Sequence, residues 1–102
     1  MIRIRFTRDR GGMLSGFYVR GHAQFVESGK DIVCAAVSSA VYMAANTVTE
    51  VLGLSPEISE CDGKLSLSLS EKEVSAARTV LEGLRLHLQA LCEQYPDYIT
   101  MD

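Results

Sequence analysis

The sequence predicts an α+β fold in which four strands and two helices follow one another in the order ββαββα. Short segments with alternating polar and apolar residues occur in pairs, and each pair precedes a long segment with apolar residues at helical spacing. Such elements form a two-layer sandwich, with a mainly antiparallel sheet and both helices packed on one of its faces. A length of 102 residues suffices for one core, so we expect a single domain over residues 1–102.

The first two strands are predicted over residues 2–7 and 13–20. In the first segment apolar residues alternate with polar ones, which is the period of a half-buried strand, and the second segment is the returning strand. Residues 9–12, Asp-Arg-Gly-Gly, have the composition of a tight turn, so the two strands form a hairpin. We expect Phe17 and Val19 to point into the core.

The first helix is predicted from Ile32 to Leu52. Valine and alanine recur in this segment at helical spacing, and Gly53 follows as a helix stop. Asp31 stands directly before the segment, and we expect its carboxylate to cap the first turn. The nearly apolar part, residues 32–45, is too short to span a bilayer, and no membrane partner is expected.

A second hairpin is predicted over residues 57–60 and 64–69, because Asp62-Gly63 between them is a strong turn signal. Alternating leucines and serines give the second of these strands one apolar and one polar face. A short last strand is expected over residues 98–101.

The second helix is predicted to follow Ser70, which matches a capping box with Glu73, and to run to about Glu93. Its apolar residues fall on one stripe from Val74 to Leu91. We expect this stripe to pack on the sheet.

The net charge of -3 is too close to zero for composition alone to indicate nucleic-acid binding, and no direct nucleic-acid partner is expected. Half of the ten basic residues nevertheless lie within the first twenty positions. They form either a solvated strand face or an edge that faces an anion. These residues are Arg3, Arg5, Arg8, Arg10 and Arg20.

The cysteines indicate a reducing compartment. Cys34, Cys61 and Cys92 are an odd number without a Cys-x-x-Cys pair, so neither a disulfide framework nor a zinc site is predicted. The amino-terminal segment lacks the apolar stretch of a secretory signal peptide. We therefore expect a cytoplasmic protein.

Cys34 is the candidate nucleophile and His22 the candidate general base. With the predicted cap at Asp31, Cys34 falls in the first helical turn, where free amides and the helix dipole stabilise a thiolate. His22 lies twelve residues earlier, and the intervening loop is long enough to fold back and bring the imidazole to the sulfur. Amides near the helix start, that of Cys34 among them, are candidates for holding an oxyanion.

Two further polar residues lie close to this candidate dyad in the sequence. Asp31 either orients His22 or serves only as the helix cap. Ser38 lies one turn after Cys34 on the same helix face, where it supports or lines the site. A cysteine in an alanine-rich helix is also commonly a small buried hydrophobe, so the spacing alone leaves a structural role open.

The segments Gly21-His22-Ala23 and Gly29-Lys30-Asp31-Ile32-Val33-Cys34-Ala35-Ala36-Val37-Ser38-Ser39 closely resemble the signature of the ribosomal-processing cysteine protease (Prp) family. The resemblance extends over the whole chain. It implies a cysteine endopeptidase with His22 and Cys34 at the catalytic positions and no metal or organic cofactor. Asp31 and Ser38 match further positions of the motif.

The resemblance also implies a substrate and an assembly. Enzymes of this family remove a short hydrophobic and aromatic N-terminal extension from a large-subunit ribosomal protein, and they are homodimers. Between the histidine and the cysteine they carry a loop that covers bound peptide. In this sequence the substrate loop includes Gly21, Ala23, Phe25 and Gly29.

Two other classes of function are alternatives. A non-catalytic ribosome-assembly or RNA-binding module would use the strand face of Arg3 and Arg5, although the sequence places no aromatic residue between these arginines. Such a module would bind RNA with a salt-dependent affinity that is retained when Cys34 is substituted. A thiol redox sensor would need a resolving cysteine, and none lies near Cys34 in the sequence.

Overall fold

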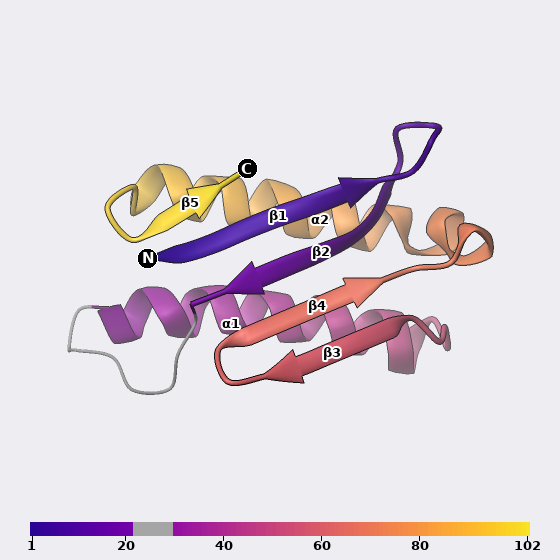
Figure 1. The fold of residues 1–102 in the computed structure, drawn as a ribbon, viewed down its shortest axis with the longest axis horizontal. Helices are drawn as coiled ribbons and strands as arrows, with labels where there is room; N and C mark the ends of the chain where they lie inside the picture. The colour runs from indigo at the N-terminus through magenta and orange to yellow at the C-terminus, as the bar shows by residue number, and fades with distance from the viewer. Residues whose placement is uncertain (22–29) are drawn as a thin grey trace.

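A five-stranded sheet with both long helices on one of its faces forms the body of the molecule in the computed structural model (Figure 1). The structure describes residues 1–21 and 30–102. The predicted ββαββα order of an α+β sandwich is confirmed, and the short last strand is present. In chain order the elements are β1 (Ile2–Arg8), β2 (Leu14–Arg20), α1 (Lys30–Asn46), η1 (Thr47–Val51), β3 (Glu57–Cys61), β4 (Lys64–Ser68), α2 (Glu71–Gln94) and β5 (Ile99–Met101).

The strand order β3-β4-β2-β1-β5 places the first and last strands of the chain side by side. The pairs among β1, β2, β4 and β3 are antiparallel, as predicted, whereas β1 and β5 pair in parallel. The amide of Ile2 donates to the carbonyl of Tyr98 at 2.8 Å, at the start of this parallel pair. The sheet therefore brings the residues after the second helix next to the first residues of the chain.

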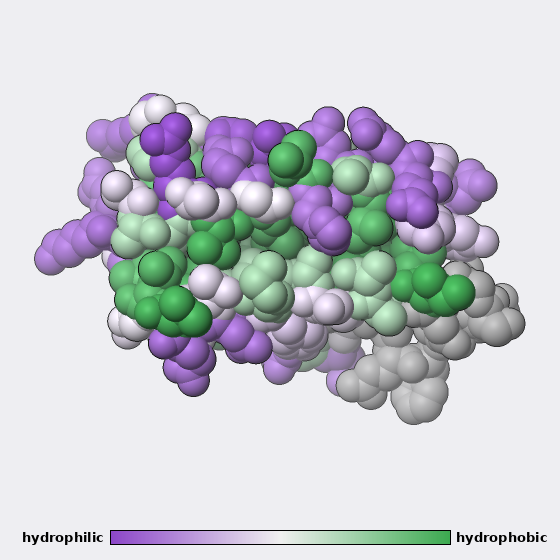
Figure 2. Space-filling view, turned by 180° about the vertical axis from the view of Figure 1, so that it is seen from behind, coloured by the Kyte–Doolittle hydropathy of each residue, from purple (hydrophilic) through white to green (hydrophobic). Residues whose placement is uncertain are grey.

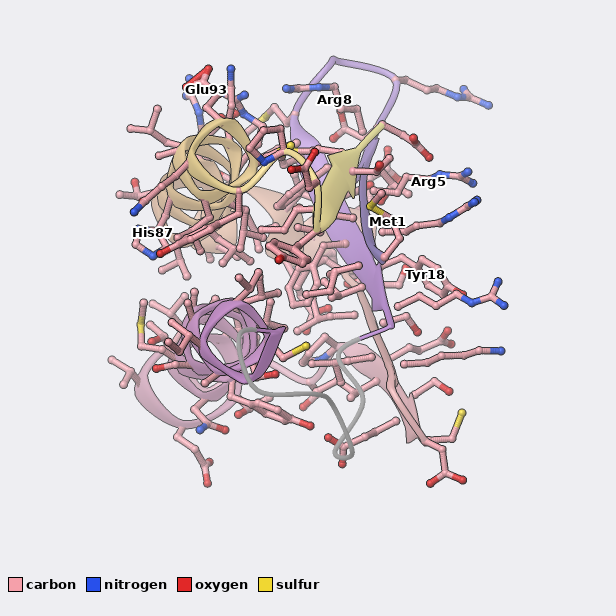
Figure 3. All side chains as sticks on the ribbon, turned by 90° about the vertical axis from the view of Figure 1, so that its left-hand side faces the viewer. Met1, Arg5, Arg8, Tyr18, His87 and Glu93 are labelled. Carbon is pink, nitrogen blue, oxygen red and sulfur yellow. The ribbon has the colours of Figure 1, made fainter. Side chains whose placement is uncertain are left out.

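The core lies between the helix-facing side of the sheet and the two helices (Figure 3). Both predicted helix stripes line it, and Phe17 and Val19 are buried as expected. The outer strand β3 contributes no buried residue, since all five of its residues are exposed. The buried stripe residues are Val33, Val37, Val41, Ala44 and Val48 from the first helical segment and Val74, Ala77, Leu81, Leu84, Leu88 and Leu91 from α2.

The first helix begins two residues earlier than predicted. α1 starts at Lys30, so Asp31 lies inside the first turn and Cys34 is the fifth helical residue. The prediction placed the cap at the last aspartate before the apolar segment, whereas the helical backbone already includes this residue. The expectation that Asp31 is the N-cap is therefore wrong.

The far end of this helix changes its hydrogen-bond pattern. α1 ends at Asn46 and continues as the π-helical segment η1, which the sequence analysis did not predict. The hydroxyl of Thr47 donates to the Met43 carbonyl at 2.7 Å, so it competes with a backbone amide for that acceptor. The amide of Leu52 then donates to the Thr47 carbonyl, five residues back, at 2.8 Å. Gly53, with φ of 68°, ends the helix as predicted.

The predicted capping box at the start of α2 is confirmed. The amide and the hydroxyl of Ser70 each donate to the Glu73 carboxylate at 3.0 Å. The other carboxylate oxygen accepts the amide of Ser55 at 2.8 Å, which ties the preceding loop to the helix. These hydrogen bonds, that of the Ser70 amide foremost, hold the pKa of Glu73 below its ordinary value.

By length and composition alone, the helical segment Ile32–Val51 is apolar enough to cross a membrane. It is longer than the apolar stretch considered from the sequence. One side of this segment packs in the core, and the other side leaves Ile32 and Met43 exposed, at 67% and 60% of their surfaces. The helix thus has two apolar sides, of which the core covers one.

Candidate active site

Cys34 lies on the second turn of α1 at the edge of a small cavity of about 160 Å³. The residue is 8% exposed, so only a narrow part of its surface is accessible. All three cysteines of the chain are thiols, and only Cys34 lies on this cavity. The described residues that line the cavity are Met1, Ile2, Gly21, Val33, Cys34, Asp97 and Tyr98.

Gly21 forms the wall of this cavity at the end of β2. Its φ is 93°, in the left-handed region that favours glycine, and a Cβ atom there would lie 2.6 Å from the carbonyl oxygen of Met1. Its amide donates to the carbonyl of Gly63 at 2.7 Å. Contacts with two distant parts of the chain therefore fix the residue that directly precedes His22.

The opposite wall comes from the connection between α2 and β5. The helix ends at Gln94, and the amide of Tyr98 donates to the carbonyl of Tyr95 at 3.0 Å in the following turn. The parallel pairing of β5 with β1 then places Asp97 and Tyr98 over the cavity. Tyr98 is half-buried and Asp97 is exposed, so an aromatic ring and a carboxylate share this wall.

The predicted site residues fall into three groups. His22, Ala23, Phe25 and Gly29 lie outside the described residues. Gly21 and Cys34 are brought together on one cavity, and the backbone of Asp31 lies in the first turn of the same helix. Ser38 is half-buried one turn after Cys34, and it is not one of the described residues that line the cavity.

The other titratable residues that the sequence offered lie elsewhere. Cys61 is exposed at the end of β3, and the thiol of Cys92 donates to the carbonyl of Ile99 at 3.3 Å. His87 is exposed on α2, at a groove between the two helices. Among the described residues, no group of three or more His, Cys, Asp or Glu side chains is placed to hold a metal ion.

The structure changes the expected source of an oxyanion-binding amide. In a helix that starts at Lys30, the amide of Cys34 points back to the Lys30 carbonyl and takes part in the helical hydrogen bonding. The amides that an α-helix leaves without helical partners belong to its first turn, before Cys34. Among the amides near the helix start, those before Cys34 are therefore the better candidates for holding an oxyanion.

Sequence reasoning missed one whole wall of the cavity. Met1, Ile2, Asp97 and Tyr98 reach the site only because β5 pairs in parallel with β1. The Tyr95-Pro96 step marked the end of the second helix, but no pattern indicated where the last strand would lie.

A cysteine near the start of a helix that opens into a small cavity is compatible with the nucleophile of a cysteine hydrolase. Residues 1–100 match the family model of the cysteine protease Prp. The chain therefore belongs to the Prp family and is a cysteine-type peptidase. This membership contradicts the alternative in which the chain is a non-catalytic module.

Curated relatives cover most or all of the chain. The ribosomal processing cysteine protease Prp of Bacillus subtilis is 33% identical over 96% of this chain and 91% of its own length. The protein of the same name from Staphylococcus aureus is 26% identical, over 100% of this chain and 98% of its own length.

Solved structures agree with the fold. The crystal structure of the essential S. aureus ribosomal processing protease Prp with a substrate peptide superposes with a TM-score of 0.89 at 24% identity, covering 100% of this chain and 98% of that chain. The same enzyme with a covalently linked product peptide gives a TM-score of 0.86 at 26% identity, with the same coverage. A Streptococcus mutans structure gives 0.84 at 30% identity, covering 100% and 92%.

Proposed function

We propose that this protein is a cysteine endopeptidase that uses a dyad of Cys34 and His22. The observation that carries the proposal is that Cys34 and Gly21 line one cavity. His22 is bonded to Gly21, whose position is fixed by the contacts with Met1 and Gly63. The residue directly before the proposed base therefore lies on the same cavity as Cys34, which supports the pairing of the two residues in a dyad.

In the proposed reaction, His22 accepts the thiol proton and the Cys34 sulfur attacks the scissile carbonyl carbon. The tetrahedral intermediate collapses as the C–N bond breaks, and His22 gives its proton to the departing amine. This leaves a thioester on Cys34. Water, deprotonated by His22, then attacks the thioester, which releases the acid product and returns the proton to the thiol. The covalently linked product in the S. aureus relative supports this route.

Supporting roles are proposed for the remaining motif residues. Asp31, one turn before Cys34 on α1, is proposed to orient His22. Ser38, one turn after Cys34, is proposed to support the nucleophile from the same helix. Gly21, Ala23, Phe25 and Gly29 are proposed to belong to the loop that covers the bound peptide.

The proposed substrate is a large-subunit ribosomal protein, from which the enzyme removes a hydrophobic and aromatic N-terminal extension in the cytoplasm. The names of the relatives as ribosomal processing proteases support this choice, as does the substrate peptide bound to the S. aureus protein. The apolar side chains of Ile2, Val33 and Tyr98 on the cavity are suited to apolar side chains of a peptide.

A direct test is to incubate the enzyme with a ribosomal protein that carries its N-terminal extension and to measure intact masses. Wild type is expected to give a truncated product, and Cys34→Ser should reduce the rate by about a thousandfold or more. His22→Ala is expected to fall to the same level, because members of a dyad act as a unit. Cys61→Ser, which changes an exposed cysteine away from the cavity, is the matched control. Cleavage by folded Cys34→Ser at the wild-type rate would reject the proposal.

We also infer that the protein is a homodimer that associates through the outer sides of α1 and α2. A groove of about 500 Å³ lies between these helices, with Met43 and Val80 among its lining residues. Figure 2 shows a continuous apolar band on this side of the molecule. The sequence from Ile32 to Thr49 contains no charged residue that would oppose burial of this side.

The dimer is tested by light scattering on wild type and Met43→Glu. Wild type should have the mass of two chains and Met43→Glu that of one, because two carboxylates would be buried at the interface. Ile58→Glu changes a similarly exposed apolar residue on β3 and is the matched control. A monomeric wild type, or a Met43→Glu variant that stays dimeric, would contradict this interface.

A further inference from the structure

The side of the sheet that the helices leave open carries a row of basic residues. Arg3 of β1 pairs with Arg20 of β2, and Arg20 pairs in turn with Lys64 of β4. Residues that pair across neighbouring strands point to the same face of a sheet. These three cations, which we call the basic row, therefore lie side by side on three adjacent strands.

We propose that this open face is an RNA-binding surface, formed by the basic row together with Arg5 and Tyr18. All four cationic side chains belong to exposed residues. Arg5 pairs with Tyr18 across β1 and β2, two residues along the strands from the basic row. Figure 3 shows Arg5 and Tyr18 pointing away from the helices.

Like charges that lie directly opposite each other on a sheet destabilise it. Arg20 lies between two other cations, and among the described residues no ion pair compensates Arg3, Arg20 or Lys64. The ion pair on this face joins Arg5 to Asp102 at 3.2 Å, beside the basic row. The charge of the row is therefore available to an anionic partner.

Tyr18 favours RNA over an acidic protein as this partner. Proteins that bind single-stranded RNA on a sheet combine cations for the phosphates with an aromatic ring on which a base stacks. In the sequence Tyr18 lies thirteen residues after Arg5, which hid their proximity, whereas the strand register places them opposite each other. The sequence showed no aromatic residue between Arg3 and Arg5, and no direct nucleic-acid contact was expected. The strand register supplies this aromatic residue, because it places Tyr18 opposite Arg5.

The position of the RNA-binding surface relates it to peptide cleavage, an inference that rests on the proposed function. Arg20 directly precedes Gly21, and Lys64 follows Gly63, whose carbonyl accepts the amide of Gly21. The basic row therefore lies at the same end of the sheet as the Cys34 cavity, on the other face. RNA held there would place the extension of an RNA-bound ribosomal protein next to the nucleophile.

The test is fluorescence anisotropy with a labelled single-stranded RNA of mixed sequence, titrated with the intact protein at several salt concentrations. With four cations engaged, the logarithm of the affinity should fall against the logarithm of salt with a slope of about -3. Arg20→Gln combined with Lys64→Gln should reduce this slope to about -1.5 and weaken binding at least tenfold at low salt. Lys72→Gln combined with Arg78→Gln removes the same charge from exposed positions of α2 and should leave binding unchanged.

Two further measurements keep the outcomes distinct. Neutralising Arg20 and Lys64 should leave the melting temperature unchanged or raise it, because it removes opposed like charges, so weaker binding would not reflect unfolding. Cleavage of a free peptide should be unchanged in this variant, and a wild type that cleaves nothing would reject the proposed function without affecting the RNA result. Absence of RNA binding by wild type, equal loss in the α2 control, or binding to polyglutamate in place of RNA would overturn the RNA-binding surface.

Discussion

The two ends of the sheet are held together in different ways. At the far end, the start of α2 is fixed by Ser70 and Glu73, three residues apart, and the turn after β1 closes within a few residues at Gly12. At the cavity end, Gly21 contacts Met1 and Gly63, and the amide of Ile2 donates a hydrogen bond to the carbonyl of Tyr98. The far end thus combines such local contacts with longer-range ones, such as the hydrogen bond from the Leu69 amide to the Ser15 carbonyl, whereas the contacts named at the cavity end all join distant segments. The cavity beside Cys34 lies at the end where the first residues of the chain, the end of β2, the second hairpin and the segment after α2 meet.

Gly21→Ala should have the largest effect and tests this contrast directly. The substitution places a Cβ atom 2.6 Å from a backbone carbonyl at a positive φ, so the first strand or β2 must shift. We expect a loss of about 2–4 kcal/mol in the free energy of unfolding, measured with urea. Gly12→Ala also has positive φ, but a Cβ atom there meets nothing within 4 Å, so about 1–2 kcal/mol is expected.

Peptide cleavage by the same two variants provides a second comparison of the two ends of the sheet. Gly21→Ala should also reduce peptide cleavage under conditions in which the variant is folded, because the residue bonded to His22 is displaced. Gly12→Ala should cleave as wild type does. Equal losses of stability and activity in the two variants would show that the cavity end is no more constrained than the far end.

The difference between local and long-range contacts also determines how much of the structure could be predicted from the sequence. Features defined by neighbouring residues were predicted correctly, including the turn at residues 62–63, the stop at Gly53 and the capping box of α2. Cys34 could be proposed as the nucleophile because its motif is contiguous. The wall formed by Asp97 and Tyr98 was not found, because no local pattern encodes the parallel pairing of β5 with β1. The basic row was hidden for the same reason, since its members come from three strands.

Tyr98→Ala should have an intermediate effect that is confined to the cavity. The change removes an aromatic wall from the site but leaves the backbone bond from Ile2 to residue 98 in place. Loss of apolar contact with a bound peptide is expected to reduce kcat/KM about tenfold, mostly through KM. Tyr95→Ala changes a half-buried tyrosine of the same turn that does not line the cavity, and it is the matched control for packing. Similar kinetic losses in both variants would mean that Tyr98 supports the fold and does not contact the substrate.

The smallest effect is expected at the far end, from Glu73→Gln. The pKa of Glu73 is lowered by the amides of Ser70 and Ser55, so its ionised form is favoured in the folded protein. A carboxyl group with a lowered pKa stabilises the fold above its unfolded pKa, and this contribution is lost as the pH falls through the folded value. Near neutral pH the variant should therefore be slightly less stable than wild type in urea. The difference should shrink as the pH falls below the ordinary value of 4.5, while peptide cleavage near neutral pH stays unchanged. If the difference in stability were the same near neutral pH and below pH 4.5, the substitution would act through packing and not through the charge of Glu73. A loss of cleavage would show that the two ends of the sheet are coupled.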